Sequence, residues 1–326
     1  MMMNIPQLDV DLRLPPAKRW HALHPFAGQA RQLLNQYLGD LGDFEQFHAT
    51  IISYRDRYIQ AEYAAELRAI AQLLDVSEEA ALIVNLYYDL LKFVLGCTAF
   101  AADTEQGPLH ARNLDWWTEM GLLSSATVVA NFQGAAAGPF QVVSWPGFTG
   151  ALSGLAPGRF AITLNAVLSN EPPTAAAPIT YLIRSVFETA STFAEAVDRL
   201  ASTAILSDCL LLITGIQPGE MVVIERTPTR SALRHPTNGR LIVTNDYLAL
   251  QANPSSISAE QQLQQTSCGR FDRASLLLKQ HTPRNAAECF SVLTDPAVCM
   301  TITAQHMVMS AAQGFLEVQL PAWFSR

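Results

Sequence analysis

The sequence predicts an α+β protein in which layers of sheet and helix pack on one another. The residues before Cys97 carry apolar side chains mainly at helical spacing, and strand-like runs begin at Cys97. Two helical patterns then separate the early strands from the late ones. Strands and helices grouped in this way are typical of packed layers, and not of alternating β-α-β units.

The helical part of the chain comes first. Residues 29–38 and 58–74 place apolar side chains three and four positions apart, as amphipathic helices do. Residues 75–78, Asp-Val-Ser-Glu, form a capping-box pattern with Asp75 as the acceptor. The pattern precedes a predicted helix over 79–93 that is apolar nearly all round, which is typical of a helix buried on several sides.

Strands follow, interrupted by helices. Runs rich in β-branched and aromatic residues predict strands at 97–102, 109–114, 126–132, 140–145, 160–164, 210–214, 221–225 and 241–244. The composition of residues 103–108, Asp-Thr-Glu-Gln-Gly-Pro, predicts a hairpin turn between the first two strands. Helical patterns occupy 179–190, 193–200 and 261–280.

Composition excludes several classes of protein. The chain has 326 residues, 49% of them hydrophobic and 15% charged, which suits a large core and excludes an intrinsically disordered chain. A net charge of −8 without a Lys/Arg-rich stripe argues against a nucleic-acid partner. No run reaches the ~18 uncharged apolar residues that a membrane span needs.

Cysteine usage and the opening residues bear on location. The five cysteines are odd in number and widely spaced, so neither a disulfide framework nor a zinc site is expected. The opening residues have neither the basic nor the apolar region of a secretory signal. We therefore expect a cytoplasmic protein without a metal or other cofactor. A processed secreted protein is the alternative.

The chemistry-bearing residues gather around Cys97, which directly follows Gly96. A buried structural role is the ordinary explanation for a cysteine, whereas a nucleophile needs neighbours that favour the thiolate and stabilise an oxyanion. The second strand of the predicted hairpin supplies Arg112 and Asp115, within side-chain reach of the first. Packing does not explain such charges in an apolar strand pair, and an ordinary salt-bridged turn is the alternative.

These residues carry a family resemblance. The run Cys97-Thr98-Ala99, then Gly107, then His110-Ala111-Arg112-Asn113-Leu114-Asp115 resembles the start of the catalytic subunit of acid ceramidases and N-acylethanolamine-hydrolysing acid amidases. These are cysteine N-terminal-nucleophile amidases, related to bile-salt hydrolases and penicillin V acylases. Further runs fit the family in colinear order: Asp9-Val10-Asp11-Leu12, Arg19-Trp20, Phe148-Thr149-Gly150, Leu152-Ser153-Gly154, residues 160–165 and Thr244-Asn245.

The resemblance implies an αββα four-layer sandwich made as a precursor that cuts itself between Gly96 and Cys97. Residues 1–96 would form a small helical N-terminal subunit, and residues 97–326 the catalytic domain. Cleavage frees an α-amino group, with a reference pKa of about 7.7–8.0, that can act as a base beside its own thiol. Gly96 replaces the bulky apolar residue usual at this position in ceramidase-like members.

The resemblance also implies a role for each matching residue. Cys97 matches the nucleophile and, through its α-amine, the acid/base. Arg112 matches the arginine that favours the thiolate, and Asp115 the aspartate that orients the amine. Asn245 matches the oxyanion-hole asparagine. Asn165 matches a second polar position near the oxyanion, with a turn-capping role as the alternative.

Two assignments are less direct. Arg270 matches the family's late active-site arginine and is preferred over Arg273, the competing register. An acyl or leaving-group pocket is predicted from nearby aromatic residues, for which core packing is the alternative: Trp116, Trp117, Trp145 and Phe148.

The predicted function is hydrolysis of the amide bond of a lipid-like N-acyl substrate through a Cys97 thioester. One alternative is an acyltransferase or amide synthase that uses the same thioester, and a second is an uncleaved binding protein without activity. The expected partners are the small-molecule substrate and the chain's own cleaved N-terminal subunit. The sequence leaves open the acyl chain, the amine, the pH optimum and the oligomeric state.

Overall fold

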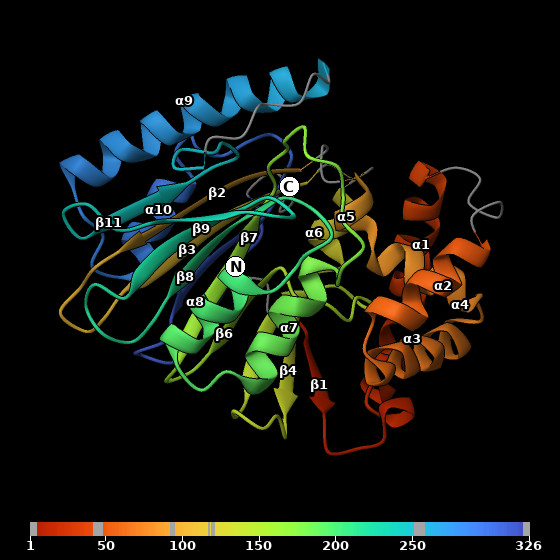
Figure 1. Ribbon diagram of the computed structural model, residues 1–326. Helices are drawn as coiled ribbons and strands as arrows, with labels where there is room; N and C mark the ends of the chain where they lie inside the picture. The colour runs from red at the N-terminus through yellow and green to blue at the C-terminus, as the bar shows by residue number, and fades with distance from the viewer. Residues whose placement is uncertain are drawn as a thin grey trace.

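Two β-sheets lie face to face with helices on their outer sides, which confirms the predicted α+β fold class (Figure 1). The computed structural model describes residues 5–41, 48–91, 95–116, 118, 121–250 and 258–321. In the described part of the chain, the layers run helix, sheet, sheet, helix.

The two sheets differ in size. The smaller has the order β11 (Arg240–Val243), β2 (Leu95–Ala102), β3 (Leu109–Trp116), β12 (Thr303–Ser310), β13 (Phe315–Gln319), and all of its neighbours are antiparallel. The larger has the order β1 (Gln7–Asp11), β4 (Val128–Gln133), β5 (Phe140–Ser144), β6 (Ser153–Ala156), β7 (Phe160–Asn165), β8 (Cys209–Thr214), β9 (Met221–Arg226), β10 (Ser231–Arg234).

Helices cover the outer face of each sheet. α9 (Ser258–Gln280) and α10 (Ala286–Leu293) lie over the smaller sheet, and α7 (Ile179–Thr189) and α8 (Phe193–Ser202) lie over the larger one (Figure 1). The central strands are thus covered on both faces, which explains why β8, Cys-Leu-Leu-Leu-Ile-Thr, is buried along its whole length. A short helix, α6 (Leu122–Ser125), precedes β4.

The N-terminal segment packs at one side of the sandwich (Figure 1). Its helices are η1 (Pro16–Lys18), η2 (His21–Phe26), α1 (Ala27–Leu41), α2 (His48–Tyr58), α3 (Ala61–Leu74), α4 (Glu78–Asn85) and α5 (Tyr87–Leu91). We expected this segment to be helical throughout, but it also contains a strand, β1, which pairs in parallel with β4. Leu8 and Val10 are buried while their neighbours are more exposed, and this alternation is the period of a strand.

The apolar helix expected over 79–93 is two helices in the described residues, with a break at Leu86. Its N-cap is Ser77, whose hydroxyl accepts a hydrogen bond from the Ala80 amide at 3.1 Å. Asp75, the expected cap, ends the preceding helix in a left-handed conformation.

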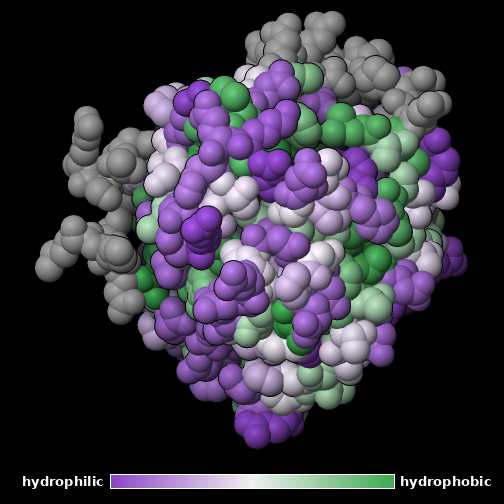
Figure 2. Space-filling view, turned by 90° about the vertical axis from the view of Figure 1, so that its left-hand side faces the viewer, coloured by the Kyte–Doolittle hydropathy of each residue, from purple (hydrophilic) through white to green (hydrophobic). Residues whose placement is uncertain are grey.

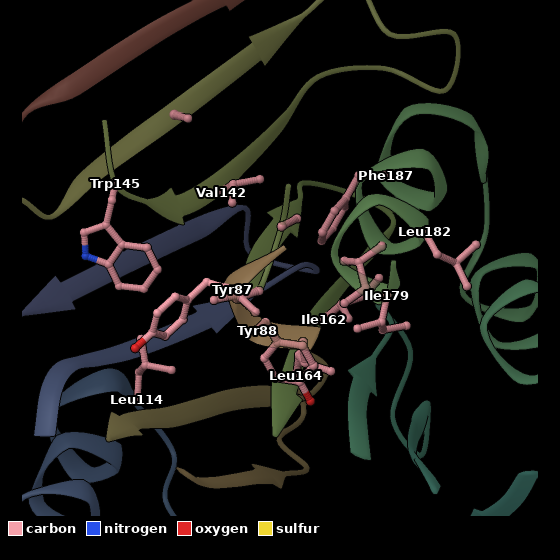
Figure 3. Close-up of a cluster of buried hydrophobic side chains, with 14 of the residues drawn as sticks. Tyr87, Tyr88, Leu114, Val142, Trp145, Ile162, Leu164, Ile179, Leu182 and Phe187 are labelled. Atoms are coloured by element: carbon pink, nitrogen blue, oxygen red, sulfur yellow. The ribbon is translucent and has the colours of Figure 1, made fainter. Parts of the chain in front are cut away.

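The core extends from the sandwich into the N-terminal segment. Tyr87 and Tyr88 of α5 belong to the same buried cluster as Leu114, Trp145 and Leu164 of the sandwich (Figure 3). On the face shown in Figure 2, hydrophobic residues lie scattered among polar ones. Every helix among the described residues is too short or too polar to cross a bilayer.

Candidate active site

The β2–β3 hairpin brings three predicted residues together. Gly96 pairs with Asp115, Cys97 with Leu114, and Ala99 with Arg112. Directly opposed residues share a face, and successive residues alternate between faces. Cys97 and Arg112 therefore point inward, toward the larger sheet, whereas Asp115 points outward, toward α9.

Arg112 carries its positive charge to the buried thiol of Cys97. Its Nη2 atom lies 3.1 Å from Cys97 Sγ and donates to the Leu164 carbonyl at 2.6 Å. Its Nη1 atom donates to the Leu152 carbonyl at 3.2 Å and to the Ser153 hydroxyl. These anchors come from the facing sheet and the loop before it, so the guanidinium is held beside the sulfur.

The backbone of Cys97 is held on both sides of its Cα atom. Its amide donates to Asn245 Oδ1 at 3.0 Å, and its carbonyl accepts a hydrogen bond from Arg270 Nη1. Arg270 also donates to Thr98 Oγ1 at 2.8 Å and to Asn245 Oδ1 at 2.7 Å. Arg273, the competing register, pairs instead with Asp295 at 2.6 Å.

Asp115 is fully buried on the outer face of the hairpin. The hydroxyl of Thr303 donates to its Oδ1 atom at 2.5 Å, and Arg270 Nη1 lies 4.0 Å from its Oδ2 atom. Burial raises the pKa of Asp115, against the opposing effects of the Arg270 charge and the Thr303 hydrogen bond. Burial likewise lowers the pKa of Arg270, against the charge of Asp115.

The two asparagines use their amide donors on backbone carbonyls. Asn245 Nδ2 donates to the Ala166 carbonyl at 2.8 Å. Asn165 Nδ2 donates to the carbonyls of Val243 at 3.2 Å and Thr244 at 2.9 Å, which ties β7 to the end of β11. The Nδ2 atom of Asn245 carries two hydrogens, and Ala166 takes one of them, so the second stays available to an oxyanion.

Three of the predicted aromatic residues line one apolar cavity of about 30 Å³: Trp116, Trp145 and Phe148. The Trp116 and Trp145 rings meet edge to face with centroids 5.7 Å apart. Leu152, whose carbonyl anchors Arg112, lines the same cavity, so the cavity adjoins the nucleophile's surroundings. Trp117 lies outside the described residues.

Tyr37 and Tyr87 close the cavity from the N-terminal segment. Their rings stack on Trp116 with centroid distances of 5.8 and 5.4 Å. Trp116 therefore lies between the sandwich and these helices. No group of three or more candidate metal-binding side chains occurs among the described residues.

Sequence reasoning missed two residues of the site. Ser153 stands inside a run that carried the family resemblance, and that run was the available signal. Thr303 stands in no recognised pattern, and only the pairing of β12 with β3 shows that it meets Asp115.

Comparisons with known proteins find a matching family and several relatives. Residues 103–308 match the family model described as acyl-coenzyme A:6-aminopenicillanic acid acyl-transferase. An N-acylethanolamine-hydrolyzing acid amidase of Caenorhabditis elegans is 28% identical over 320 residues, 89% of each chain. An acid ceramidase of Balaenoptera acutorostrata scammoni is 26% identical over 352 residues, 97% of this chain and 86% of the relative.

The solved structure of a C. elegans N-acylethanolamine-hydrolyzing acid amidase ortholog shares the fold. It aligns with a TM-score of 0.54 and 24% identity, covering 66% of this chain and 93% of that one.

Proposed function

Since the chain belongs to the acyl-coenzyme A:6-aminopenicillanic acid acyl-transferase family, we propose that it is an amidase that hydrolyses N-acyl amides through a thioester on Cys97. The observation that carries this proposal is the Arg112 guanidinium 3.1 Å from a buried thiol. The names of the relatives, an N-acylethanolamine-hydrolyzing acid amidase and an acid ceramidase, support a lipid-like N-acyl substrate.

The proposed reaction uses the thiol and the α-amine of Cys97 as one unit. The amine takes the thiol proton, and sulfur attacks the amide carbonyl carbon. The resulting oxyanion collapses, the carbon–nitrogen bond breaks, and the leaving amine takes the proton. Water then attacks the thioester, again losing a proton to the α-amine, and the carboxylic acid leaves as the thiol is restored.

This chemistry needs a free α-amine, so we propose self-cleavage between Gly96 and Cys97. Sulfur attacks the Gly96 carbonyl carbon, the peptide bond breaks, and the thiol proton passes to the Cys97 nitrogen, which leaves as the free α-amine. Water then hydrolyses the thioester, which releases the Gly96 carboxylate and restores the thiol. Asn245 and Arg270, which hold the Cys97 amide and carbonyl, support this step because they fix the bond beside the thiol. Residues 1–96 and 97–326 would be the two products, and the first would be the natural partner of the second.

Intact-mass measurement and substrate assays test the proposal together. Wild-type protein should give two fragments split at Cys97 and release carboxylic acid from N-acylethanolamines or ceramides. Cys97→Ala should stay as one inactive chain, and Cys97→Ser should cleave slowly at most. Cys268→Ala, which removes an exposed thiol, should behave as wild type.

Two results would overturn this function. Wild-type protein that remains uncleaved and inactive would favour a binding protein. Two fragments from Cys97→Ala would mean that an external protease makes the cut.

Acyl transfer is the second candidate, because the family description names an acyltransferase. The two activities share the thioester and differ in whether water or an amine attacks it. Adding a primary amine during turnover and measuring the ratio of amide to acid by mass spectrometry separates them. An amide product in excess over the acid would favour transfer.

We also propose that the protein works in a reducing compartment such as the cytoplasm. None of the five cysteines, all of which the structure describes, takes part in a disulfide, including the exposed Cys268, which supports this location. Cell fractionation with an antibody to the chain tests it, and recovery from an oxidising compartment would contradict it.

A further inference from the structure

An irregularity in β12 determines which residue faces Asp115. Gln305 pairs with Leu114 of β3, so regular pairing would place Ala304 opposite Asp115. The register shifts between Thr303 and Gln305, and Thr303 takes that position instead. Bulges of this kind re-aim a side chain next to an active site. Here the shift places the hydroxyl of Thr303 beside the buried carboxylate of Asp115, where regular pairing would place the methyl group of Ala304.

The hydrogen bonds around the Thr303 hydroxyl fix the direction of its proton. Its oxygen accepts from the Met300 amide at 3.0 Å. The Cys299 thiol lies 3.6 Å from the same oxygen and 3.6 Å from the Met300 carbonyl, so its one hydrogen has two acceptors. The single hydrogen of the Thr303 hydroxyl goes to Asp115 Oδ1 at 2.5 Å, because a carboxylate oxygen is the strongest acceptor within reach. Thr303 therefore acts as a donor toward Asp115, which suits an ionised carboxylate.

The second oxygen of Asp115 is left for another partner. Asp115 Oδ2 is buried and makes no hydrogen bond within the described residues. It lies 3.6 Å from the position that a Cβ atom on Gly96 would occupy, so it faces the residue whose peptide bond would be cut. The Cys97 amide, with its single hydrogen, donates to Asn245 instead.

We propose that Thr303 is a positioning residue, which holds one oxygen of Asp115 so that the other receives the α-amine of Cys97 once it is free. This inference rests on the proposed cleavage. A free amine carries more hydrogens than the amide, so one can stay on Asn245 while another reaches Asp115 Oδ2. The bulge, the Thr303 hydroxyl and the Asp115 oxygen that makes no hydrogen bond in the described part of the chain thus act together to orient the base.

Thr303→Val, which keeps the shape and removes the hydroxyl, tests the role. Per cleaved molecule, kcat should fall about 10- to 100-fold, as expected for a lost hydrogen bond to a charged group, with little change in KM. The hydrogen bond from Thr303 lowers the pKa of Asp115, so the acid limb of the kcat profile should move to higher pH. Thr303→Ser should restore both values.

The other groups near Asp115 stay in place in these variants: the guanidinium groups of Arg112 and Arg270 and the thiol of Cys299. Thr127→Val is the matched control. Thr127 is also buried, and its hydroxyl accepts a hydrogen bond at 2.8 Å from Gln305, which lies in β12 with Thr303. Removing the Thr127 hydroxyl should leave the acid limb unchanged, because it does not contact Asp115.

An unmoved acid limb in Thr303→Val, with wild type cleaved and active, would overturn this inference alone. If Thr303→Val does not fold or cleave, the carboxyl titration of Asp115 is followed by NMR in Cys97→Ala, with and without Thr303→Ala. The hydroxyl-free chain should titrate at higher pH, and coincident curves would overturn the role. Failure of wild type to cleave would instead count against the proposed function.

Discussion

At the scale of single residues, strand β2 divides the chemistry of Cys97 between its two faces. The thiol points inward, where Arg112 meets it at 3.1 Å. Asp115 pairs with Gly96 and points outward, so it reaches the backbone side of Cys97 and not the sulfur. Arg112 and Asp115 therefore serve different atoms of one residue, and neither charge can replace the other.

Asn245 offers a test of which end of its amide matters. Asn245→Asp keeps an oxygen for the Cys97 amide and Arg270 but loses the Nδ2 donor, whereas Asn245→Ala loses both. If Nδ2 stabilises the oxyanion, both variants should lower kcat about 10²–10³-fold with little change in KM. Steady-state kinetics, normalised to the cleaved fraction, measures this. Near-normal turnover in Asn245→Asp would show that Asn245 acts only by holding the backbone.

At the scale of elements, the start of β2 is packed too closely for a side chain at Gly96. A Cβ atom there would lie 2.9 Å from Met300 Sδ and 3.2 Å from Asp115 Cβ. Met300 stands in the turn before β12, so it fills space that a larger residue before Cys97 would need. Gly96 departs from the family pattern, and Met300 occupies the space that a side chain at that position would take.

Gly96→Ala should therefore slow self-cleavage several-fold by displacing Asp115, and Met300→Ala should restore part of the rate in the double variant. The fraction cleaved over time, from intact mass, measures both. Gly269→Ala is the control, because nothing lies within 4 Å of a Cβ atom at that position on α9. Equal cleavage in Gly96→Ala and wild type would show that the contact does not constrain the bond.

The elements also show how far the sequence leads. Strands with continuous apolar runs, such as β8 and β9, were predicted within about two residues, because burial on both faces leaves a plain hydrophobic signal. β12, Thr-Ala-Gln-His-Met-Val-Met-Ser, was missed although all of it is buried. Several of its polar side chains bond partners far away in the sequence, as His306 bonds Asn113 at 2.7 Å, and local composition cannot show such partners.

The same distinction applies to the site. The turn composition at 103–108 predicted the hairpin, and the hairpin alone brings Arg112 beside Cys97. Arg270 came from the family resemblance, and its hydrogen bonds now distinguish it from Arg273. Thr303 could not be predicted, because its position depends on a register shift between strands far apart in the sequence.

At the scale of the whole molecule, a buried ion-pair network joins the N-terminal segment to the sandwich. Glu66 of α3 accepts from Arg19 at 2.9 Å, from Trp20 at 2.8 Å, and from both Nη atoms of Arg184 of α7 at 2.6 and 2.8 Å. Burial alone would raise the pKa of Glu66, but the Arg184 charge holds it below its usual value. The Arg19-Trp20 run that carried the resemblance belongs to this junction.

Glu66→Gln should cost about 3–5 kcal/mol of unfolding free energy, because it removes a fully buried charge from the network and leaves Arg184 with Glu188 as its remaining ion-pair partner. Glu62→Gln is the control. Glu62 also pairs with Arg19 at 2.9 Å, but its side chain is 64% exposed, so its loss should cost no more than about 1 kcal/mol. Urea unfolding of the uncleaved Cys97→Ala chain measures both, and equal losses would contradict the argument.

Acid should loosen the contact between the two sheets through His110. Its ring lies between the hydroxyls of Thr163 at 2.8 Å and Thr214 at 3.1 Å, both on the facing sheet. Burial lowers the pKa of His110 to about 3, with the Arg112 charge acting in the same direction. Histidine in the unfolded chain has a pKa of about 6.5, so between pH 3 and 6.5 the unfolded chain binds a proton at His110 and the folded chain does not. The contribution of neutral His110 to the unfolding free energy is therefore complete above pH 6.5 and is lost as the pH falls toward 3.

His110→Gln should therefore flatten the pH dependence of stability, because glutamine keeps a donor and an acceptor but does not titrate. Between pH 4 and 6, the unfolding free energy of the uncleaved Cys97→Ala chain should fall with decreasing pH. One histidine contributes about 1.4 kcal/mol per pH unit to this slope, and His110→Gln should remove that amount. His306, whose pKa burial lowers to about 4, would supply part of the slope that remains. An unchanged slope in His110→Gln would mean that His110 does not couple proton uptake to the separation of the sheets.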